Sequence, residues 1–559
     1  MPFRGMKVAS VDAIVIGAGA GGGIVAAELA QAGLQVSLFD RGGNFSAADF
    51  DHDELTASQA PWNRNGRRFG PDFAEIQSYR ANPGTAAREV SSRDGYFSIV
   101  GWCVGGGTLI YQGLSWRFHP QTFRLKSLYG AIGGSTVEDW PISYDDLEPY
   151  YEKAEYELGI CGETSPTGPP RRKPYPMAPL ADDREAQMLF PAAKRLGWKP
   201  FHPPLAITSA EYRGRPACIR CPYCVGYLCE ANAKSSTAVT VIPQALKSGL
   251  CTLHAQTVVR EIIVVGRGRP SGVIYREGNG PWKEMRAKLI VVAASAVETP
   301  RLLLNSKSRW FPTGIGNRYD QVGRHAHQDR SVAVFGYFDK VVSDGQGPGP
   351  GCALDFQFQD PNLEGGGVLY NGFSRTPLRV VNTLPRPEGM KSWGREFKEF
   401  YGRYFWKHIR VYCGAHGLPR EGNRVDLDPQ LRDSLGMPVA RVTHRGHAWS
   451  APQLEWVAAR AEQLLKEAGA QFTLNHRILP EPDEPLGEHQ CGTCRMGSDP
   501  RSSVTDRTGR VHDVANVFVV DGSLLTNSGG CNPCLTIQAL AYWVSEHIVR
   551  GWKGGGLNA

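Results

Sequence analysis

The sequence contains no apolar run that approaches the roughly 18 to 20 residues needed to span a lipid bilayer. Residues 1–10 lack the apolar core of a secretory signal, and Lys and Arg nowhere form the long blocks that follow a nucleic-acid backbone. Internal repeats and low-complexity tracts are also missing. These absences predict a cytoplasmic chain without membrane insertion and without a nucleic-acid partner. Export together with a partner subunit is the alternative.

The chain is long and its composition is ordinary for a globular protein. Its 559 residues exceed the usual domain size of roughly 100 to 200 residues, so more than one domain is expected. The net charge of +7 is too small for this length to identify a partner. Ser143 is a favourable helix-start residue and predicts a helix over 144–158. Residues 41–98, rich in turn formers and weakly periodic, are interpreted as an extended surface loop.

A glycine-rich turn follows the first apolar run. Residues 11–16 are typical of a buried parallel strand and lead directly into Gly17, Gly19 and Gly22. Such glycines permit a tight turn, close approach of the backbone to a pyrophosphate, and close packing of the next helix on the strand. Asp40 ends the second strand, where a carboxylate accepts hydrogen bonds from ribose hydroxyls. The pattern predicts a dinucleotide site, but the spacing does not separate FAD from NAD.

Residues suited to proton transfer occur near the carboxyl end. His489 carries an imidazole that can take a hydroxyl proton at neutral pH, and Asn532 carries an amide that can hold the resulting oxygen. A lone histidine is also commonly a hydrogen-bonded interior residue. The residue types alone therefore leave catalysis and packing open.

The sequence around these residues resembles the glucose-methanol-choline (GMC) oxidoreductases. The similar stretches at the carboxyl end are 489–497, 519–523, 532–533 and 535–541, and further ones are the first glycine turn, 104–109 and 294–306. The resemblance implies an α/β protein with an FAD-binding Rossmann-type domain, residues 1–325 plus 485–559. A mixed-sheet α+β substrate domain, residues 326–484, is inserted into it.

The resemblance also implies FAD as cofactor, His489 as the active-site base and Asn532 as its second residue. No histidine occurs in residues 108–111, so we expect FAD to be held without a covalent bond. Tyr111 replaces the Asn or small residue expected to face the flavin. The predicted cofactor-binding residues are Gly17, Gly19, Gly22, Asp40, Gly105, Gly106, Thr108, Tyr111, Val258, Asp521, Gly522 and Pro533.

Four cysteines lie within residues 218–229. Cys218, Cys221, Cys224 and Cys229 have spacings compatible with an iron–sulfur cluster, structural zinc, disulfides or buried thiols. Residues 139–151 and 218–236 resemble the sugar and sugar-acid dehydrogenase branch, such as the gluconate and fructose dehydrogenase flavoprotein subunits. Some relatives there carry an iron–sulfur cluster, which favours that alternative.

A second set of thiols lies near His489. The two pairs Cys491/Cys494 and Cys531/Cys534 have zinc-like spacing, but we interpret them as buried thiols. His325 and His327, at the predicted domain boundary, either pack in a loop or reach the cofactor. Most aromatic residues of the middle segment, including Tyr370, are interpreted as core.

The predicted function is FAD-dependent oxidation of a hydroxyl group on a sugar, polyol, sugar acid or sugar-containing metabolite. Hydride passes to the flavin and His489 takes the proton. An electron-acceptor protein or partner subunit is the expected partner besides the substrate. The alternatives are an alcohol oxidase that uses dioxygen on a non-sugar alcohol, and an electron-transfer flavoprotein without its own alcohol chemistry.

Overall fold

A computed structural model describes residues 9–50, 53–54, 70, 75–92, 94–98, 101–266, 268–372, 376–475, 478–479 and 481–557. The largest sheet has seven strands in the order β5-β2-β1-β8-β7-β6, with β16 also paired to β8. The pairs among β5, β2, β1, β8 and β16 are parallel, whereas β6, β7 and β8 pair antiparallel. The strands are β1 (Ala9–Ile16), β2 (Val36–Phe39), β5 (Cys251–His254), β6 (Thr257–Val265), β7 (Arg269–Glu277), β8 (Lys283–Val292) and β16 (Val517–Val519).

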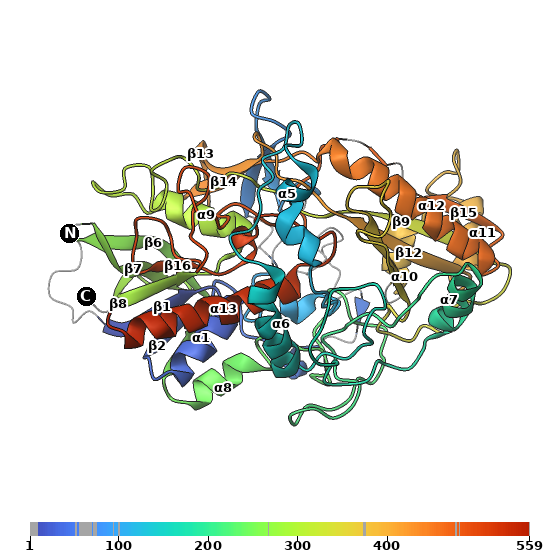
Figure 1. Ribbon diagram of the computed structural model, residues 1–559, viewed down its shortest axis with the longest axis horizontal. Coiled ribbons are helices and arrows are strands. Elements are labelled where there is room, and N and C mark those ends of the chain that lie inside the picture. The colour runs from blue at the N-terminus through green and yellow to red at the C-terminus, as the bar shows by residue number, and fades with distance from the viewer. Residues whose placement is uncertain are drawn as a thin grey trace.

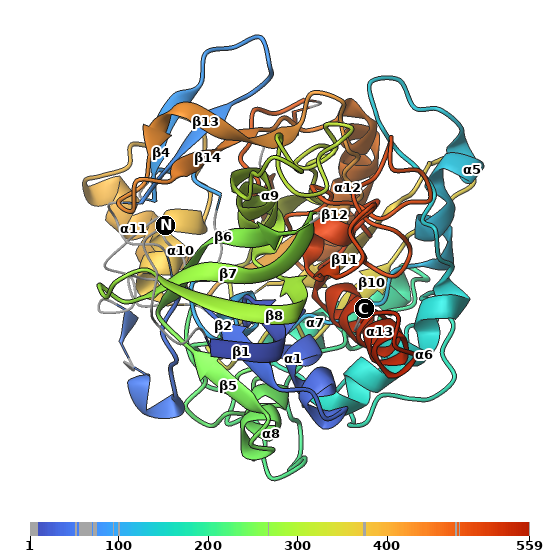
Figure 2. The same ribbon diagram turned by 90° about the vertical axis from the view of Figure 1, so that its left-hand side faces the viewer.

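Helices cover this sheet because its central strands are apolar on both faces. Four consecutive residues of β1, from Ala13 to Ile16, are buried. Helix α1 contacts α13 and α8, and α13 also contacts α6, which brings both ends of the chain together beside the sheet (Figure 1). Figure 2 shows the strands of this sheet stacked as one twisted layer. The helices are α1 (Gly22–Gln31), α6 (Tyr144–Leu158), α8 (Val241–Lys247), α9 (Ser295–Asn305) and α13 (Cys534–Lys553).

Helix α6 confirms the sequence prediction at its first residue. The Ser143 hydroxyl accepts a hydrogen bond from the Asp146 amide (3.2 Å), and the Asp146 carboxylate accepts one from the Ser143 amide (2.8 Å). This reciprocal pair satisfies two of the free amides at the helix start. The helix ends at Gly159, whose φ of 70° is a conformation that favours glycine.

A second, antiparallel sheet lies at the other end of the long axis (Figure 1). Its strand order is β10-β11-β12-β9-β15, and α12 packs on it, with α7 against α12. Val334, Ile409 and Val457 are fully buried in the core between this sheet and α12. The elements are β9 (Arg330–Tyr337), β10 (Ala353–Asp355), β11 (Gly367–Asn371), β12 (His408–Ala415), β15 (Phe472–Asn475), α7 (Arg184–Arg195), α10 (Pro377–Thr383), α11 (Arg395–Tyr404) and α12 (Ala451–Glu467).

A third sheet joins distant segments in the order β13-β14-β3-β4. Strands β3 (Ile76–Arg80) and β4 (Arg88–Ser91) lie within 41–98, so the interpretation of that whole segment as loop is wrong. They form because β3 pairs in parallel with β14 (Pro438–Thr443), which in turn pairs with β13 (Arg424–Arg432). The remaining short helices are η1 (Ala47–Asp49), α4 (Gly107–Ile110), η2 (Pro120–Arg124), α5 (Leu125–Tyr129), η3 (Ala448–Ser450) and η4 (Gly522–Leu524).

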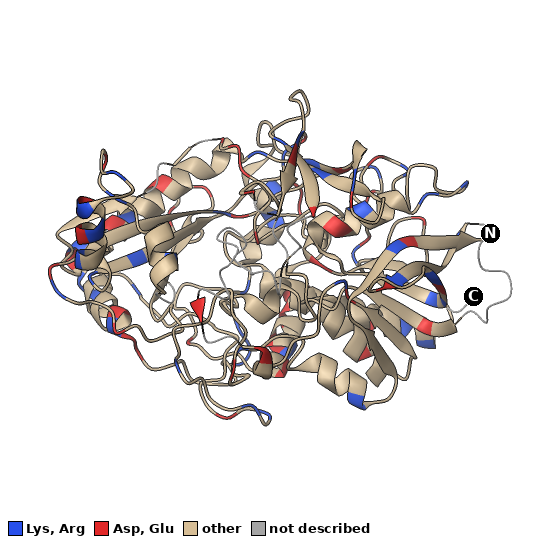
Figure 3. Ribbon diagram, turned by 180° about the vertical axis from the view of Figure 1, so that it is seen from behind, with Lys and Arg blue, Asp and Glu red and all other residues tan. Residues whose placement is uncertain are grey.

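The arrangement confirms the predicted α/β class, with mixed sheets and helices. The residue boundaries of the two predicted domains stay a prediction. Seen from behind, basic and acidic residues are interspersed (Figure 3). Within the described residues, no helix combines the length and apolar character needed to cross a membrane.

Acid is expected to destabilise the fold because four buried histidines are held neutral. Burial lowers the pKa of His327 and His444 to about 4 and that of His416 to about 3. Burial also lowers the pKa of His325 well below its usual range. Histidines of the unfolded chain take up protons at about pH 6.5, so the unfolded state binds more protons below that pH. The free energy of unfolding therefore falls as the pH drops from about 6.5 toward 4.

The measurement is the melting temperature followed by circular dichroism from about pH 8 to about pH 5. His416→Gln, which removes one titrating group, is expected to flatten the decline. A melting temperature that stays constant across this range would contradict the prediction.

Candidate active site

The turn between β1 and α1 requires glycine for two different reasons. Gly17 has φ +103°, and a Cβ there would lie 2.2 Å from the Ala293 carbonyl oxygen. A Cβ on Gly22 would lie 1.9 Å from the Gly17 carbonyl oxygen, so Gly22 allows α1 to pack closely on the turn. The first amides of α1 have no partners within the helix and are a favourable site for an anionic group.

Asp40 stands at the end of β2 with both carboxylate oxygens engaged by backbone. The Ala18 amide donates to Oδ2 and the Gly42 amide donates to Oδ1, each at 2.8 Å. Burial raises the pKa of Asp40 to about 7. Each carboxylate oxygen has a further lone pair and can therefore also accept a hydrogen bond from a ribose hydroxyl. Such hydrogen bonds would favour the ionised carboxylate.

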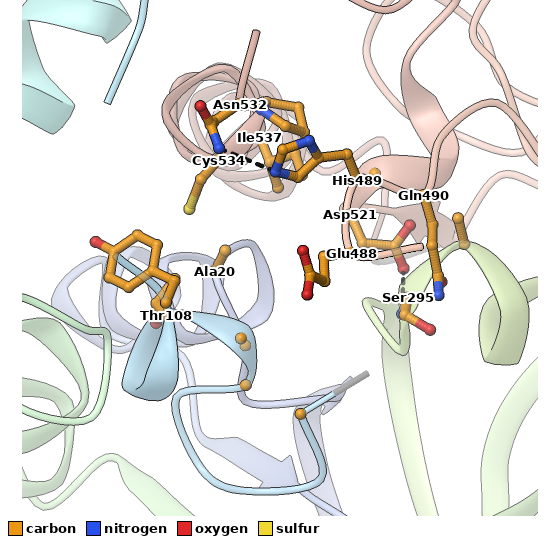
Figure 4. A pocket seen from close by; sticks show the side chains of 18 of the residues that line it. Ala20, Thr108, Ser295, Glu488, His489, Gln490, Asp521, Asn532, Cys534 and Ile537 are labelled. Atoms are coloured by element: carbon orange, nitrogen blue, oxygen red, sulfur yellow. Dashed lines mark hydrogen bonds between the residues drawn. The ribbon is translucent and has the colours of Figure 1, made fainter. Parts of the chain in front are cut away.

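A cavity of about 770 Å³ extends from this turn to His489 and Asn532 (Figure 4). Its volume is typical of cofactor and small-molecule sites. Gly22 and Gly105 do not line it; Gly105 has φ +95° and shapes the second glycine turn. The other predicted cofactor-binding residues all line the cavity: Gly17, Gly19, Asp40, Gly106, Thr108, Tyr111, Val258, Asp521, Gly522 and Pro533.

Asp521 joins the carboxyl-terminal segment to the first turns of α9. Its Oδ2 accepts hydrogen bonds from the Ser295 amide (3.0 Å) and the Thr299 hydroxyl (2.6 Å). Its Oδ1 accepts from the amide and hydroxyl of Ser523. Burial raises the pKa of Asp521, while these donors lower it. The carboxylate therefore holds α9 and η4 together at the cavity wall.

His489 and Asn532 meet in the structure although 43 residues separate them. Asn532 Nδ2 lies 3.0 Å from His489 Nε2, the bond drawn in Figure 4. On the other side of the ring, His489 Nδ1 lies 2.6 Å from Asp329 Oδ1. Because a carboxylate only accepts and an amide nitrogen only donates, Nδ1 carries the proton and Nε2 presents its lone pair.

Asp329 is a site residue that sequence reasoning missed. It lies directly before β9, its side chain is 8% exposed, and it lines the cavity. Its neighbours His325 and His327, the candidates that the sequence suggested here, do not line the cavity. His325 Nδ1 bonds Thr136 and His327 Nδ1 donates to the His325 carbonyl oxygen. The only sequence pattern that could have indicated Asp329 was a carboxylate close to two histidines, His325 and His327.

Tyr111 is oriented by the chain behind it. Its hydroxyl donates to the Ser235 carbonyl oxygen at 2.9 Å, and its ring lines the cavity. Burial raises the pKa of Tyr111 well above its ordinary value, so the phenol stays neutral. The residue thus supplies a neutral aromatic wall to the cavity.

The four cysteines of residues 218–229 are free thiols. The Arg220 amide donates to Cys218 Sγ at 3.3 Å, and the Lys234 amide donates to Cys229 Sγ at 3.4 Å. Burial raises the pKa of Cys218 to about 11 and that of Cys224 to about 12. Among the described residues, no three His, Cys, Asp or Glu side chains are placed to hold a metal ion. The arrangement therefore does not support the predicted iron–sulfur ligand set.

Comparison with known proteins identifies the family. Family models of the GMC oxidoreductases match residues 11–328 and 419–541. The chain belongs to the GMC oxidoreductases. GMC oxidoreductases bind FAD, so the chain is an FAD-dependent oxidoreductase that acts on alcohol-like or sugar-like CH–OH groups. This confirms the family and the cofactor FAD.

Several GMC relatives match over nearly the whole chain. The 2-methyl-1,2-propanediol dehydrogenase of Mycolicibacterium austroafricanum is 30% identical, covering 96% of this chain and 95% of its own. The 6'''-hydroxyparomomycin C oxidase of Streptomyces lividus is 31% identical, covering 96% and 91%. The fructose dehydrogenase large subunit of Gluconobacter japonicus is 27% identical, covering 98% and 99%, and a gluconate 2-dehydrogenase flavoprotein of Pantoea cypripedii is 26% identical, covering 97% and 94%. The predicted branch is thus represented, alongside enzymes named for other hydroxyl compounds.

Solved structures show the same fold. The crystal structure of pyridoxine 4-oxidase from Mesorbium loti superposes with a TM-score of 0.60 at 17% identity, covering 96% of this chain and 98% of that one.

Asp40→Ala is expected to lower the affinity for FAD by about tenfold or more, because it removes the acceptor suited to ribose hydroxyls and leaves the Ala18 and Gly42 amides without their partner. The measurement is FAD content from the visible absorbance of the purified protein. Asp40→Asn keeps one acceptor oxygen and is expected to lie between the parent and Asp40→Ala. Parental FAD content in both variants would remove Asp40 from the nucleotide site.

Proposed function

We propose that this GMC oxidoreductase oxidises a hydroxyl group of a sugar, polyol, sugar acid or sugar-containing metabolite, with His489 as the base. The observation that carries the proposal is the chain Asn532–His489–Asp329 at the wall of the cavity that the glycine turn also lines. The residues present fit FAD, because the cavity combines glycine turns and the Asp40 carboxylate with a proton acceptor farther along.

Oxidation of the hydroxyl group removes one proton and one hydride from the substrate, and the site residues have separate roles in this reaction. A substrate hydroxyl that lies beside both side chains would replace the hydrogen bond between Asn532 Nδ2 and His489 Nε2. It would donate its hydrogen to Nε2 and accept a hydrogen bond from the Asn532 amide. As the carbon–oxygen double bond forms, the O–H proton moves to Nε2 and Asp329 stabilises the imidazolium. The glycine turns and Asp40 would hold FAD, which would supply the acceptor for the hydride of the carbon that bears this hydroxyl.

The substrate class is supported by the relatives and by the cavity wall. The relatives are named for a diol, a paromomycin compound, fructose and gluconate, all of which carry hydroxyl groups. Tyr370 and Tyr412 line the cavity as a stacked pair with ring centroids 5.5 Å apart. Aromatic faces of this kind suit the C–H faces of sugars. Tyr370, interpreted from the sequence as core, therefore also borders the site.

Reduced enzyme needs an electron acceptor, and we propose a protein or partner subunit. The support is that two relatives are named as a large subunit and as a flavoprotein of their dehydrogenases. The test compares reoxidation of the reduced enzyme by dioxygen and by an artificial one-electron dye. Fast hydrogen peroxide formation at the rate of dye reduction would instead identify an oxidase.

The test of the hydroxyl oxidation is an anaerobic titration of the purified holoenzyme with sugars, polyols and aldonates. Bleaching of the flavin absorbance by members of this panel, with a carbonyl product, is the expected result. Denaturation is expected to release FAD, since residues 108–111 contain no histidine. An enzyme that holds FAD and is bleached by none of the panel would overturn the proposal.

A further inference from the structure

One face of the second sheet forms a wall of the cavity beside the reaction centre. Its cavity-lining side chains stand in two rows across β9, β12 and β11: Ser331, Gly414 and Val368, then Ala333, Tyr412 and Tyr370. Directly opposed residues of antiparallel strands place their side chains on the same face, so both rows belong to one surface. Asp329, which bonds His489, lies two residues before Ser331, at most roughly 7 Å away along an extended chain. The first row is therefore the one nearer the base.

Ser331 presents an uncovered hydroxyl to the cavity. The residue is exposed, whereas the other seven residues of β9 are buried. Gly414, its partner on β12, has no side chain that could cover it. Within the part of the chain that the structure describes, the Ser331 hydroxyl forms no hydrogen bond. Because a serine hydroxyl donates one hydrogen bond and accepts two, this group is available to a bound molecule.

Tyr370 presents a second hydroxyl to the same half of the cavity. The residue is 8% exposed and its ring stacks on Tyr412, yet its hydroxyl has no hydrogen-bond partner among the described residues. Burial raises the pKa of Tyr370 well above its ordinary value, and Tyr412, Asp329 and Cys531 raise it further. Since charge effects weaken with distance, the phenol lies near Asp329 and near Cys531, the residue before Asn532. A buried tyrosine hydroxyl usually finds a partner, so this one suits a group of the ligand.

The third polar group is a backbone carbonyl. Gly530 lies two residues before Asn532 and lines the cavity, and its φ of +67° favours glycine. A Cβ on Gly414 would lie 3.0 Å from the Gly530 carbonyl oxygen, so this oxygen stands over the gap that Gly414 leaves in the first row. No N–H or O–H group of the described residues donates to it. A carbonyl without a donor is uncommon inside a protein, and a ligand can supply the missing hydrogen.

The three groups together match a hydroxyl better than an anion. The Gly530 carbonyl oxygen only accepts hydrogen bonds, so the group that binds it must carry a hydrogen. A carboxylate offers only lone pairs, and the Asp329 carboxylate adds negative charge at this end of the sheet. The hydroxyls of Ser331 and Tyr370 both donate and accept. A substrate hydroxyl, which also does both, can therefore bond to each of the three groups.

We propose that Ser331 and Tyr370, with the Gly530 carbonyl, bind a second hydroxyl group of the substrate while His489 and Asn532 hold the reacting one. This inference rests on the proposed function and assigns to these groups the discrimination between polyhydroxylated substrates and simple monohydric alcohols. Ser331 and Tyr370 are then specificity-determining residues that contact substrate away from the bonds that change.

The first test measures specificity. The two substrates are the sugar or polyol that reduces the flavin fastest and hexan-1-ol, which has no second hydroxyl. In Ser331→Ala and in Tyr370→Phe, kcat/KM for the polyhydroxylated substrate is expected to fall about tenfold, whereas that for hexan-1-ol changes less than about twofold. Tyr370→Phe keeps the ring that stacks on Tyr412. The matched control is Tyr156→Phe, which removes a hydroxyl that donates to the Pro174 carbonyl oxygen at 3.2 Å outside the cavity lining.

The second test measures binding without turnover. Enzyme reduced with dithionite under anaerobic conditions cannot oxidise a substrate, because its flavin already holds two electrons. Glucose, glucitol and erythritol are titrated into this enzyme by calorimetry, with butan-1-ol as the monohydric match for erythritol. At least one of the three is expected to bind and to lose about tenfold in affinity in Ser331→Ala and in Tyr370→Phe, with no such loss in Tyr156→Phe.

Binding of none of the three compounds to the parent enzyme, or unchanged affinity in folded, FAD-loaded Ser331→Ala and Tyr370→Phe, would overturn the inference. Because binding to the reduced enzyme needs no turnover, binding that depends on these hydroxyls in an enzyme that oxidises no hydroxyl would refute only the proposed function. Oxidation of hexan-1-ol by the parent as efficiently as the best polyhydroxylated substrate would refute only the recognition of a second hydroxyl.

Discussion

His489→Ala is expected to lower the rate of substrate-dependent flavin reduction by about a thousandfold, because it removes the group that takes the hydroxyl proton. The lone pair of Nε2 faces Asn532, and no other imidazole among the described residues lines the cavity. Without this base the hydroxyl must lose its proton to water while the hydride leaves. The measurement is anaerobic stopped-flow reduction under saturating substrate.

The control is His202→Asn, since His202 lies outside the cavity and pairs with Glu163 and Asp182 near the surface. His489→Ala and His202→Asn are both expected to retain the FAD content of the parent. The reason is that His489 lies at the end of the cavity proposed to hold the substrate, away from the glycine turn. Reduction of His489→Ala at the parental rate would show that the mechanism is wrong.

Asp329→Asn is expected to lower the same rate by about a hundredfold to a thousandfold, because an asparagine amide can donate to Nδ1 and favour the tautomer with the proton on Nε2. In that tautomer His489 has no lone pair toward the substrate. Asp329→Glu keeps a carboxylate and is expected to recover part of the rate. The measurement is the pH profile of kcat/KM together with the rate of flavin reduction.

The pH profile separates positioning from general damage to the fold. In Asp329→Asn the rising limb is expected to shift to lower pH, since the imidazolium loses its carboxylate partner. Asp355→Asn is a matched control, because Asp355 also pairs with an imidazole, that of His119 at 2.9 Å, outside the cavity lining. A shift of the rising limb in Asp355→Asn but not in Asp329→Asn would remove Asp329 from the mechanism.

Short local patterns in the sequence correctly predicted those helices and strands whose formation depends on their own residues. The unit of β1, α1 and β2 followed from an apolar run, a glycine turn and a terminal Asp40, and α6 followed from its Ser143 cap. Strands β3 and β4 were missed because β3 pairs with β14, whose paired residues lie 363 positions further along the chain (Ser78 with Arg441), and β4 pairs with β3. Pairing at that distance leaves little local pattern.

The cysteine segment shows the opposite outcome. Four thiols in residues 218–229 are a strong local signal, yet the described side chains are not arranged as metal ligands. Spacing along a chain fixes only which thiols are near one another in sequence. Whether their sulfur atoms converge depends on the backbone path, here shaped by contacts such as the Lys234 ammonium with the Cys224 carbonyl oxygen (2.6 Å).

By itself the sequence determined the nucleotide-binding unit, the family resemblance and the pair His489 and Asn532, because short motifs encode tight turns and residue chemistry locally. Only the tertiary structure decided that Asp329 stands behind His489 and that Gly22 and Gly105 shape turns without lining the cavity. The reason is that a side chain's role depends on which distant strands pack beside it. The pairing of distant strands is driven by the burial of whole sheets, and residues adjacent in the sequence do not determine it.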